Sequence, residues 1–402
     1  MAQPRIVLFT DAKPETGRAL ADCLRGNRLA FSEKNIEADT KSADLVGRVC
    51  GDNVVPTVYA DGAWLADPTE DEVLRAAGAI AAGSTAAVGG RANFDVIVIG
   101  LGPAGLAACH GCRMGGLSVL GLDENEPGGH LLSLRNVDEY LGVGHDDTFS
   151  GEDVADNFAQ HARQSGAVLM RGRVQQVRTR GLLKRVNTEK SRFWSRAVVV
   201  ATGAARNSLD VRGLEKYLNQ GIRVGGRLDP RHYAGRRVCV VGDGEEALNA
   251  AIFLAQHAGH VTLLCPGETP SAEPQLVQRA VAQGVRMIPS ARLVEVRGRD
   301  ALDYLFFEEK GIEEEQGLPV DAIVIALNPA PKAALSGLES LPQENGYFAH
   351  GEGGKTMFGG IYVAGDCTSI SLRTLQGVVA SGSLCSRRLW QWLAQNPLPR
   401  FR

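Results

Sequence analysis

Two glycine-rich turns constrain the fold of this chain more than any other feature of its sequence. The first, Gly100–Gly105, reads G-x-G-x-x-G, and the second, Gly242–Ala247, reads G-x-G-x-x-A. Each turn follows an apolar run and opens a helix-like stretch, which lets backbone N–H groups approach a pyrophosphate at a helix N-terminus. One such turn is a weak signal, but the pair predicts two dinucleotide sites on two Rossmann-like domains of an α/β protein.

Length and composition indicate a globular protein of two or three domains. The chain has 402 residues, of which 44% are hydrophobic and 22% charged, as in soluble globular proteins. The net charge of −3 gives no general attraction to nucleic acid or to an anionic membrane. Neither an apolar run of membrane-spanning length nor a signal peptide is found, so we expect a cytoplasmic location without nucleic-acid or membrane partners. The eight cysteines are scattered, unlike a secreted disulfide framework.

Residues 1–80 predict a small α/β domain. Strands are expected at 6–9 and 31–36, helices at 17–25 and 42–50, then a hairpin around Asp61-Gly62 and a helix from Glu70. This order resembles the glutaredoxin/thioredoxin-like fold, with Pro56 where that family has its cis-proline. The family's C-x-x-C is replaced by Lys13-Pro14-Glu15-Thr16, so the resemblance implies a domain without a dithiol. We favour a docking or dimer-forming role for it over a catalytic one.

Residues 81–92 are small and flexible, as in a linker, and residues 93–402 alternate strand-like and helix-like pieces. After Gly105 come a helix, a strand and Asp123-Glu124, where an acid can bind a ribose hydroxyl. With the later pieces, this part resembles the low-molecular-weight thioredoxin reductase family over almost all of its length. The later pieces are Pro127-Gly128-Gly129-His130, Val137–Gly142, Ala201–Ala204 and Gly360–Asp366.

The resemblance implies FAD at the first site and a homodimer. It also implies an FAD-binding domain at 93–212 and 329–402, interrupted by an NAD(P)-binding-like domain at 213–328. Asp366 would hold the ribityl chain, and Arg373-Thr374 would begin a helix under the isoalloxazine ring. The implied cofactor-binding residues are Gly100, Gly102, Pro103, Ala104, Gly105, Asp123, Glu124, Gly129, His130, Val174, Ala201, Thr202, Gly203, Gly365, Asp366, Arg373 and Thr374.

Two of these residues depart from the family pattern. His130 replaces a glutamine, so it is either an ionisable group near the flavin or an exposed loop histidine. Thr374 replaces the glutamine of an Arg-Gln pair, which would reshape the site at the flavin pyrimidine.

The second site lacks the residues that the family uses for disulfide chemistry and for NADPH. The family's two cysteines align with Gly225 and Leu228, so electrons cannot pass from the flavin to a disulfide by that route. No arginine occurs between Arg237 and Arg279, where the family binds the 2′-phosphate of NADPH. The second site is therefore expected to be degenerate rather than working, with NADPH binding poorly or not at all.

Two acids reinforce this expectation. Glu245 and Glu246 stand at the start of the second helix, where a carboxylate repels pyrophosphate modestly. No acid stands at the end of the following strand itself, where it would favour NAD, although Glu268 is close.

Other cysteines offer weaker signals. Cys109 and Cys112 are spaced C-x-x-C inside the first helix, which favours packing over redox chemistry or metal ligation, and no metal site is predicted. Cys367 follows Asp366 and is either a thiol near the flavin or a packed side chain.

The sequence thus predicts an FAD-binding oxidoreductase without the redox-active cysteine pair, transferring electrons directly at the flavin. Its partner would be a redox protein or a small-molecule electron acceptor, and the sequence does not choose among ferredoxin-like proteins, quinones, oxygen and small disulfides. The alternative is a non-catalytic flavoprotein in which FAD is structural or sensory and the thioredoxin-like domain binds a partner.

Overall fold

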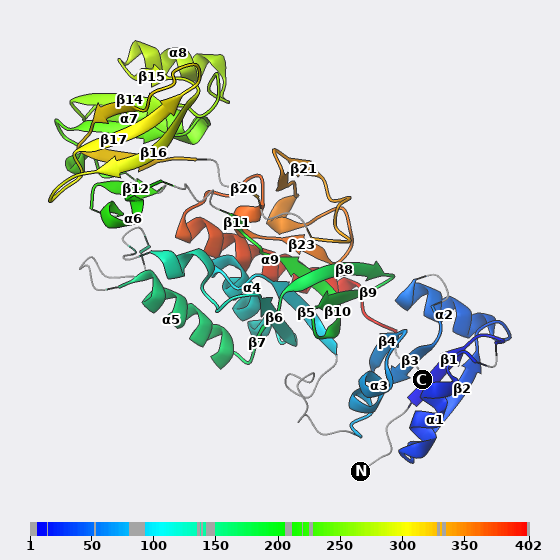
Figure 1. The fold of residues 1–402 in the computed structure, drawn as a ribbon. Coiled ribbons are helices and arrows are strands. Elements are labelled where there is room, and N and C mark those ends of the chain that lie inside the picture. The colour runs from blue at the N-terminus through cyan, green and yellow to red at the C-terminus, as the bar shows by residue number, and fades with distance from the viewer. Residues whose placement is uncertain are drawn as a thin grey trace. The chain divides into compact units, whose positions relative to one another are not determined.

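The computed structural model describes residues 6–13, 15–51, 54–79, 93–134, 137, 140–141, 149–205, 211–218, 220–224, 228–327, 330–331 and 335–399. The predicted linker 81–92, Gly225 and half of the 137–142 piece lie outside these residues. The chain divides into two compact units, Met1–Gly203 with Pro331–Arg402 (unit 1) and Ala204–Ala330 (unit 2). Figure 1 labels the elements, and each unit is described by itself.

The N-terminal part of unit 1 is a sheet of order β2-β1-β3-β4 with helices α1, α2 and α3. The central strand β1 is parallel to β2 and antiparallel to β3, which pairs with β4 in a hairpin. All five residues of β1 are buried because they are apolar or threonine in the middle of the sheet. The bounds are β1 Ile6–Thr10, α1 Arg18–Gly26, β2 Phe31–Asn35, α2 Thr40–Cys50, β3 Thr57–Ala60, β4 Ala63–Ala66 and α3 Glu70–Ala76. The order of strands and helices predicted for this segment is present, and the Val55–Pro56 peptide bond is cis.

The second part of unit 1 is built on a larger sheet of order β7-β6-β5-β10-β9-β8. Strands β7, β6, β5 and β10 are parallel, and β23 pairs with β10 in the same direction. Strands β8, β9 and β10 form an antiparallel meander. The bounds are β5 Asn93–Ile99, α4 Pro103–Met114, β6 Val119–Asp123, α5 Gly151–Gln164, β7 Val168–Arg171, β8 Val174–Arg180, β9 Leu183–Thr188 and β10 Arg192–Val200.

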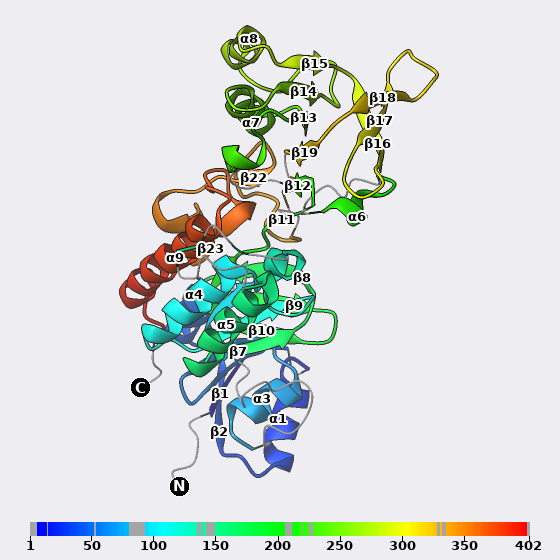
Figure 2. The ribbon, with the colours of Figure 1, turned by 90° about the vertical axis from the view of Figure 1, so that its left-hand side faces the viewer.

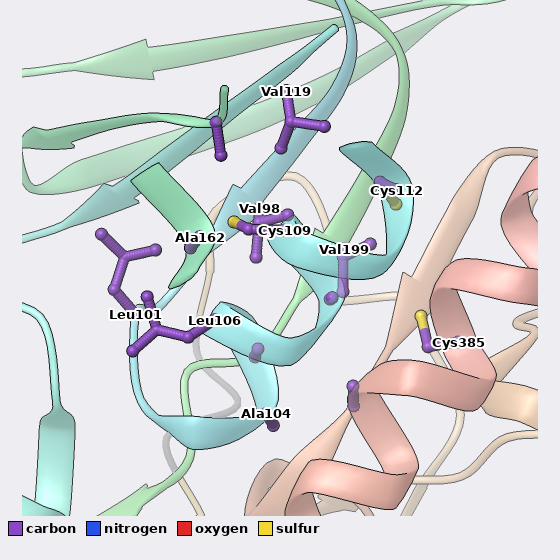
Figure 3. Close-up of a cluster of buried hydrophobic side chains, with 14 of the residues drawn as sticks. Val98, Leu101, Ala104, Leu106, Cys109, Cys112, Val119, Ala162, Val199 and Cys385 are labelled. Carbon is purple, nitrogen blue, oxygen red and sulfur yellow. The ribbon is translucent and has the colours of Figure 1, made fainter. Parts of the chain in front are cut away.

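The C-terminal segment returns to this sheet and ends in a long helix. Its elements are β21 Gln343–Glu344, β22 Tyr347–Phe348, β23 Ile361–Val363 and α9 Leu375–Gln395. Helix α9 lies beside α4 (Figure 2). The two backbones approach so closely that a Cβ on Gly382 would overlap the Ala104 carbonyl oxygen. Buried side chains of both helices share one apolar cluster, which includes Val98, Cys109, Cys112 and Cys385 (Figure 3).

Unit 2 contains a parallel sheet of order β12-β19-β13-β14-β15 and an antiparallel sheet β16-β17-β18. Its bounds are α6 Leu214–Tyr217, β12 Ile222–Val224, β13 Arg237–Val241, α7 Glu245–Ala255, β14 His260–Leu264, α8 Pro274–Ala282, β15 Arg286–Ile288, β16 Ala291–Arg297, β17 Tyr304–Glu309, β18 Gln316–Pro319 and β19 Ala322–Ile325. Two short strands, β11 Ala204–Ala205 and β20 Ala330–Pro331, pair with each other. In the described part of the chain, no helix has the length and apolar character needed to cross a membrane.

Candidate functional site

The first glycine-rich turn joins β5 to α4 with a backbone that only glycine permits. Gly100 has a φ of +96°, and a Cβ there would overlap the Ala201 carbonyl oxygen. A Cβ on Gly105 would overlap the carbonyl oxygen of Gly100, so the helix can pack this closely on the strand only with glycine. Gly102 is the N-cap of α4. A Cβ on Gly102 would meet only the Cα of Gly129, at 3.9 Å.

The N-terminus of α4 offers backbone N–H groups to a ligand. No side chain caps this helix, and its first turn contains no acidic residue. Uncapped N–H groups and the helix dipole together favour a negatively charged group at this end. The turn is therefore built to accept a pyrophosphate.

The two acids after β6 do different things. The Asp123 carboxylate accepts hydrogen bonds from the backbone N–H groups of Leu101 at 2.7 Å and Asn125 at 2.9 Å, so it braces the glycine-rich turn. Glu124 is exposed, and its Oε2 lies 3.6 Å from Arg173 Nε. Of the two predicted acids, Glu124 has the more accessible carboxylate for a ribose hydroxyl.

The Pro127–His130 loop lies against the same turn. Gly128 N–H donates to the Leu101 carbonyl oxygen at 2.8 Å, and Gly129 packs on Gly102. His130 is exposed beside this contact, with its Nδ1 3.0 Å from Ser133 Oγ. His130 is therefore exposed, and it directly follows Gly129, the residue that packs on Gly102.

Residues from the end of the chain complete the site. Gly365 has a φ of +75° and lies against the Ala104 methyl group, so a larger residue would push α4 away. Asp366 is half-buried, and its Oδ1 accepts a hydrogen bond from Ser371 Oγ at 2.6 Å. Asp366 directly follows Gly365, the residue that contacts Ala104 of α4.

The start of α9 is also shaped as predicted. Thr374 is the N-cap, and its side chain accepts a hydrogen bond from Gly377 N–H. Arg373 has a φ of +50°, and its guanidinium carbon lies 4.7 Å from the centre of the Tyr347 ring. Helix α9 begins directly after this pair, where the family resemblance places a helix start.

The structure brings most of the predicted residues together around the first glycine-rich turn. The glycine-rich turn meets Ala201, Gly129 and Gly365 through the close contacts given above. Thr202 and Gly203 continue from Ala201 and hydrogen-bond the Cys367 thiol. Val174 begins β8, where it is half-buried against a second apolar cluster. The residue before it, Arg173, lies with its Nε 3.6 Å from Glu124 Oε2. Glycines that leave no room for a Cβ, uncapped N–H groups and an exposed acid fit a dinucleotide with a pyrophosphate and a ribose.

The second glycine-rich turn also depends on glycine at its start, but it carries a different charge. Gly242 has a φ of +155°, and a Cβ there would overlap the Ala326 carbonyl oxygen. Gly244 is the N-cap of α7 without side-chain capping, as Gly102 is for α4. Glu245 and Glu246 occupy the first turn of α7, so this helix end carries carboxylates where α4 carries none.

A cation that the sequence analysis missed lies near the end of β14. Lys310 Nζ lies 2.5 Å from Glu268 Oε1, and both side chains are largely exposed. Backbone hydrogen bonds connect Lys310 to Ser290 and Ser290 to Gly267. Lys310 is 42 residues from Glu268, and only the β16–β17 hairpin brings it back to this edge. The absence of arginine here therefore does not leave the edge without a positive charge.

The thiols are packed inside the protein. All eight cysteines are free, and all except Cys23 are buried. Burial raises the pKa of Cys112 to about 12 and the pKa of Cys109 well above its usual range. In Figure 3 both lie in the apolar cluster around α4, which agrees with a packing role. Burial also raises the pKa of Cys367 to about 11. No group of histidine, cysteine and carboxylate side chains that could hold a metal is found among the described residues.

Comparisons with known proteins agree with this geometry. The family model "Pyridine nucleotide-disulphide oxidoreductase" matches residues 94–383. The chain is 28% identical to a thioredoxin reductase of Listeria innocua over 306 residues, which covers 75% of this chain and 94% of that protein. It is 28% identical to a bifunctional thioredoxin reductase/thioredoxin of Mycobacterium leprae over 307 residues, covering 75% and 66%.

Solved structures give the same result. The crystal structure of thioredoxin reductase from Streptococcus pyogenes superimposes with a TM-score of 0.68 at 25% identity, covering 76% of this chain and 99% of that one. The predicted resemblance to thioredoxin reductase is confirmed, as is the mixed α/β fold of the matched part.

Proposed function

We propose that this chain, which belongs to the pyridine nucleotide-disulphide oxidoreductase family, is an oxidoreductase that exchanges electrons with its partners directly at a bound flavin. Thioredoxin reductase-like members of the family are FAD-binding flavoproteins, so the cofactor predicted from the sequence is FAD. One observation carries the proposal. The glycine-built site at α4 is intact, whereas Gly225 and Leu228 stand where the resemblance places the two cysteines.

Each part of FAD has residues suited to it. The N–H groups at the start of α4 would bind the pyrophosphate, and Glu124 would bind the ribose. Asp366 would hold the ribityl chain, and the N-terminus of α9 at Arg373 and Thr374 would lie at the isoalloxazine ring. When bound, FAD supplies a ring that accepts and releases two electrons. The protein supplies binding and orientation, and no protein sulfur is needed to relay electrons.

The second dinucleotide site is proposed to be degenerate. Glu245 and Glu246 place negative charge at the helix end where a pyrophosphate would bind, which weakens that interaction. Lys310 is already paired with Glu268, so a 2′-phosphate would have to displace a carboxylate. Both features support weak binding of NADPH.

The N-terminal segment is proposed to be a thioredoxin-like domain used for docking. Its mixed sheet of order β2-β1-β3-β4 and its three helices support this. Lys13, Glu15 and Thr16 exclude a dithiol at the predicted position. We place this domain at residues 1–80, a linker at 81–92, the FAD-binding domain at 93–212 and 329–402, and the NAD(P)-binding-like domain at 213–328. A homodimer is proposed by analogy with the family.

Anaerobic stopped-flow absorbance tests the proposal. The purified protein should show flavin absorbance and should be reduced by dithionite, while NADPH and NADH reduce it only slowly. Rapid bleaching by NADPH would show that the second site works. Colourless protein that cannot be reconstituted with FAD would contradict the proposal that FAD is the cofactor. Reduction of thioredoxin at ordinary enzymatic speed would contradict the proposal that the chain has no sulfur relay.

The alternative function is a flavoprotein that performs no electron transfer. The absence of both cysteine pairs favours it as much as it favours direct transfer. After reduction by dithionite and removal of excess reductant, a quinone or a ferredoxin-like protein should reoxidise the flavin within seconds if the proposed function holds. Reoxidation by none of the acceptors, oxygen included, would favour the structural or sensory alternative.

A further inference from the structure

Four arginines lie on one face of the β8–β9–β10 meander. Arg178 of β8 stands directly opposite Arg185 of β9, which stands opposite Trp194 of β10. Residues directly opposite each other, or two apart along a strand, point to the same face of a sheet. Arg180 and Arg192 therefore share this face with Arg178 and Arg185.

Few acids balance the positive charge of this face, although the Arg185 guanidinium also lies 5.8 Å from the centre of the Trp194 ring. Only 12% of the Arg185 side chain is exposed, and its nearest acid, Asp67, lies 4.0 Å away with 62% of its own side chain exposed. The Nε of Arg185 is buried and donates no hydrogen bond. Within the described ranges, neither Arg178 nor Arg180 forms an ion pair, and Arg192 donates only to the Asp67 backbone carbonyl.

The surroundings make the imbalance costly. Burial and the charges of Arg192, Arg178 and Arg180 lower the pKa of Arg185, while Asp67 raises it. Arginines directly opposite each other on neighbouring strands destabilise a sheet through like-charge repulsion. The chain as a whole has a net charge of −3, so the cluster does not reflect a generally basic protein.

We propose that this face binds a small oxyanion of the phosphate or carboxylate class, held by Arg178, Arg180 and Arg185. Guanidinium groups pair bidentately with both kinds of anion. A neighbouring cleft of about 440 Å³ contains Arg192 but is also lined by Asp71, Glu72 and Glu189. Their carboxylates repel an anion, so the ligand lies on the β8–β9 side of Arg192.

Isothermal titration of the FAD-loaded, full-length protein tests this site. The probes are inorganic pyrophosphate and malonate at low ionic strength, and the variant is Arg178→Gln/Arg180→Gln. The matched control, Arg25→Gln/Arg292→Gln, removes two exposed arginines that are already paired with carboxylates. Binding should weaken at least about tenfold in the variant and less than about twofold in the control. The tighter probe identifies the group as phosphate or carboxylate.

Thermal unfolding supplies a readout that loss of a structural contact would not give. Without anion, the variant should melt at a higher temperature than the wild type because like-charge repulsion is relieved. With pyrophosphate or malonate, the wild type should gain stability and the variant should not. Failure of both probes to bind, or equal binding by variant and wild type, overturns the proposal.

Discussion

The Asp123 carboxylate accepts a hydrogen bond from the Leu101 backbone N–H at 2.7 Å, which fastens the end of β6 to the glycine-rich turn. Asp123→Ala should lower the free energy of unfolding by about 1.5–3 kcal/mol, because a hydrogen bond to a charged group is lost. It should also weaken FAD binding, since the turn is no longer held. Urea unfolding and the flavin-to-protein ratio measure the two effects.

Glu124→Ala tests whether ribose binding is separate from the hydrogen bond by which Asp123 holds the glycine-rich turn. Glu124 is exposed, and in the described part of the chain its carboxylate accepts no hydrogen bond from a backbone N–H. Its loss should therefore weaken FAD binding while the free energy of unfolding stays within about 0.5 kcal/mol of wild type. Equal losses of stability in both variants would contradict this division of roles. Glu126→Ala, another exposed acid, is the neutral control.

Gly105→Ala should disrupt the first site from within. Its Cβ would overlap the Gly100 carbonyl oxygen, so α4 must move away from β5 at a cost of about 1–3 kcal/mol. Flavin content after purification and the thermal midpoint should both fall. The control is Gly26→Ala in α1, where a Cβ meets nothing within 4 Å; alanine is favoured over glycine in a helix, so stability should be unchanged or higher.

The sequence predicted the strand, turn and helix of the first site because their signals are local. The apolar strand β5, the glycine spacing and Pro103 at the start of α4 lie within a dozen residues, and local spacing determines how strand, turn and helix join. The packing of Gly365 and Gly382 against α4 involves residues far along the chain, and only the resemblance to a known family pointed there.

Long-range pairing explains what the sequence could not show. Lys310 reaches Glu268 only through the β16–β17 hairpin. Arg178 stands opposite Arg185 only in the observed register of β8 against β9. A slip of one residue would turn the Arg178 side chain to the other face of the sheet. The hydrogen bond from Leu101 N–H to Asp123 could not be predicted from the sequence. An aspartate at this position is equally suited to bind a ribose hydroxyl or a backbone N–H.

Glu268→Gln should shift the second site toward NADPH. It frees the Lys310 ammonium from its carboxylate, and an exposed charge interaction of about 0.2–1 kcal/mol corresponds to up to about fivefold in affinity. Dissociation constants for NADPH and NADH, measured by titration calorimetry, should change for NADPH and stay constant for NADH. Lys310→Gln should show no such gain; an equal change for both nucleotides would place the 2′-phosphate elsewhere.

The buried thiols should be chemically silent in the native protein. Cys23 is the one cysteine that is partly exposed, so a thiol reagent such as DTNB should modify it first and leave Cys109, Cys112 and Cys367 intact. In denaturant all eight should react. The double variant Cys109→Ala/Cys112→Ala should keep the flavin spectrum and its reduction by dithionite. Rapid labelling of this pair in the folded protein would instead indicate redox activity.

Because of Lys184, the free energy of unfolding should increase with pH between about 8 and 10.5. Lys184 is buried, with its Nζ 3.4 Å from the Leu182 carbonyl oxygen and 5.4 Å from the Trp392 ring centre. Among the described residues, no carboxylate lies within ion-pair distance of it. Burial lowers the pKa of Lys184 from 10.5 to about 8. Between these values the unfolded chain holds a proton that the folded protein lacks, so stability increases with pH through this window.

Replacing the charge gives the matching prediction. The difference between 10.5 and about 8, at about 1.4 kcal/mol per pH unit, corresponds to about 3.5 kcal/mol. Lys184→Met should therefore raise the free energy of unfolding by up to about 3.5 kcal/mol at pH 7. This advantage should shrink above pH 8 and vanish near pH 10.5. Urea titrations across this range measure it, with exposed Lys190→Met as the control. A stability difference that does not vary with pH would show that the lysine is not buried as a charge.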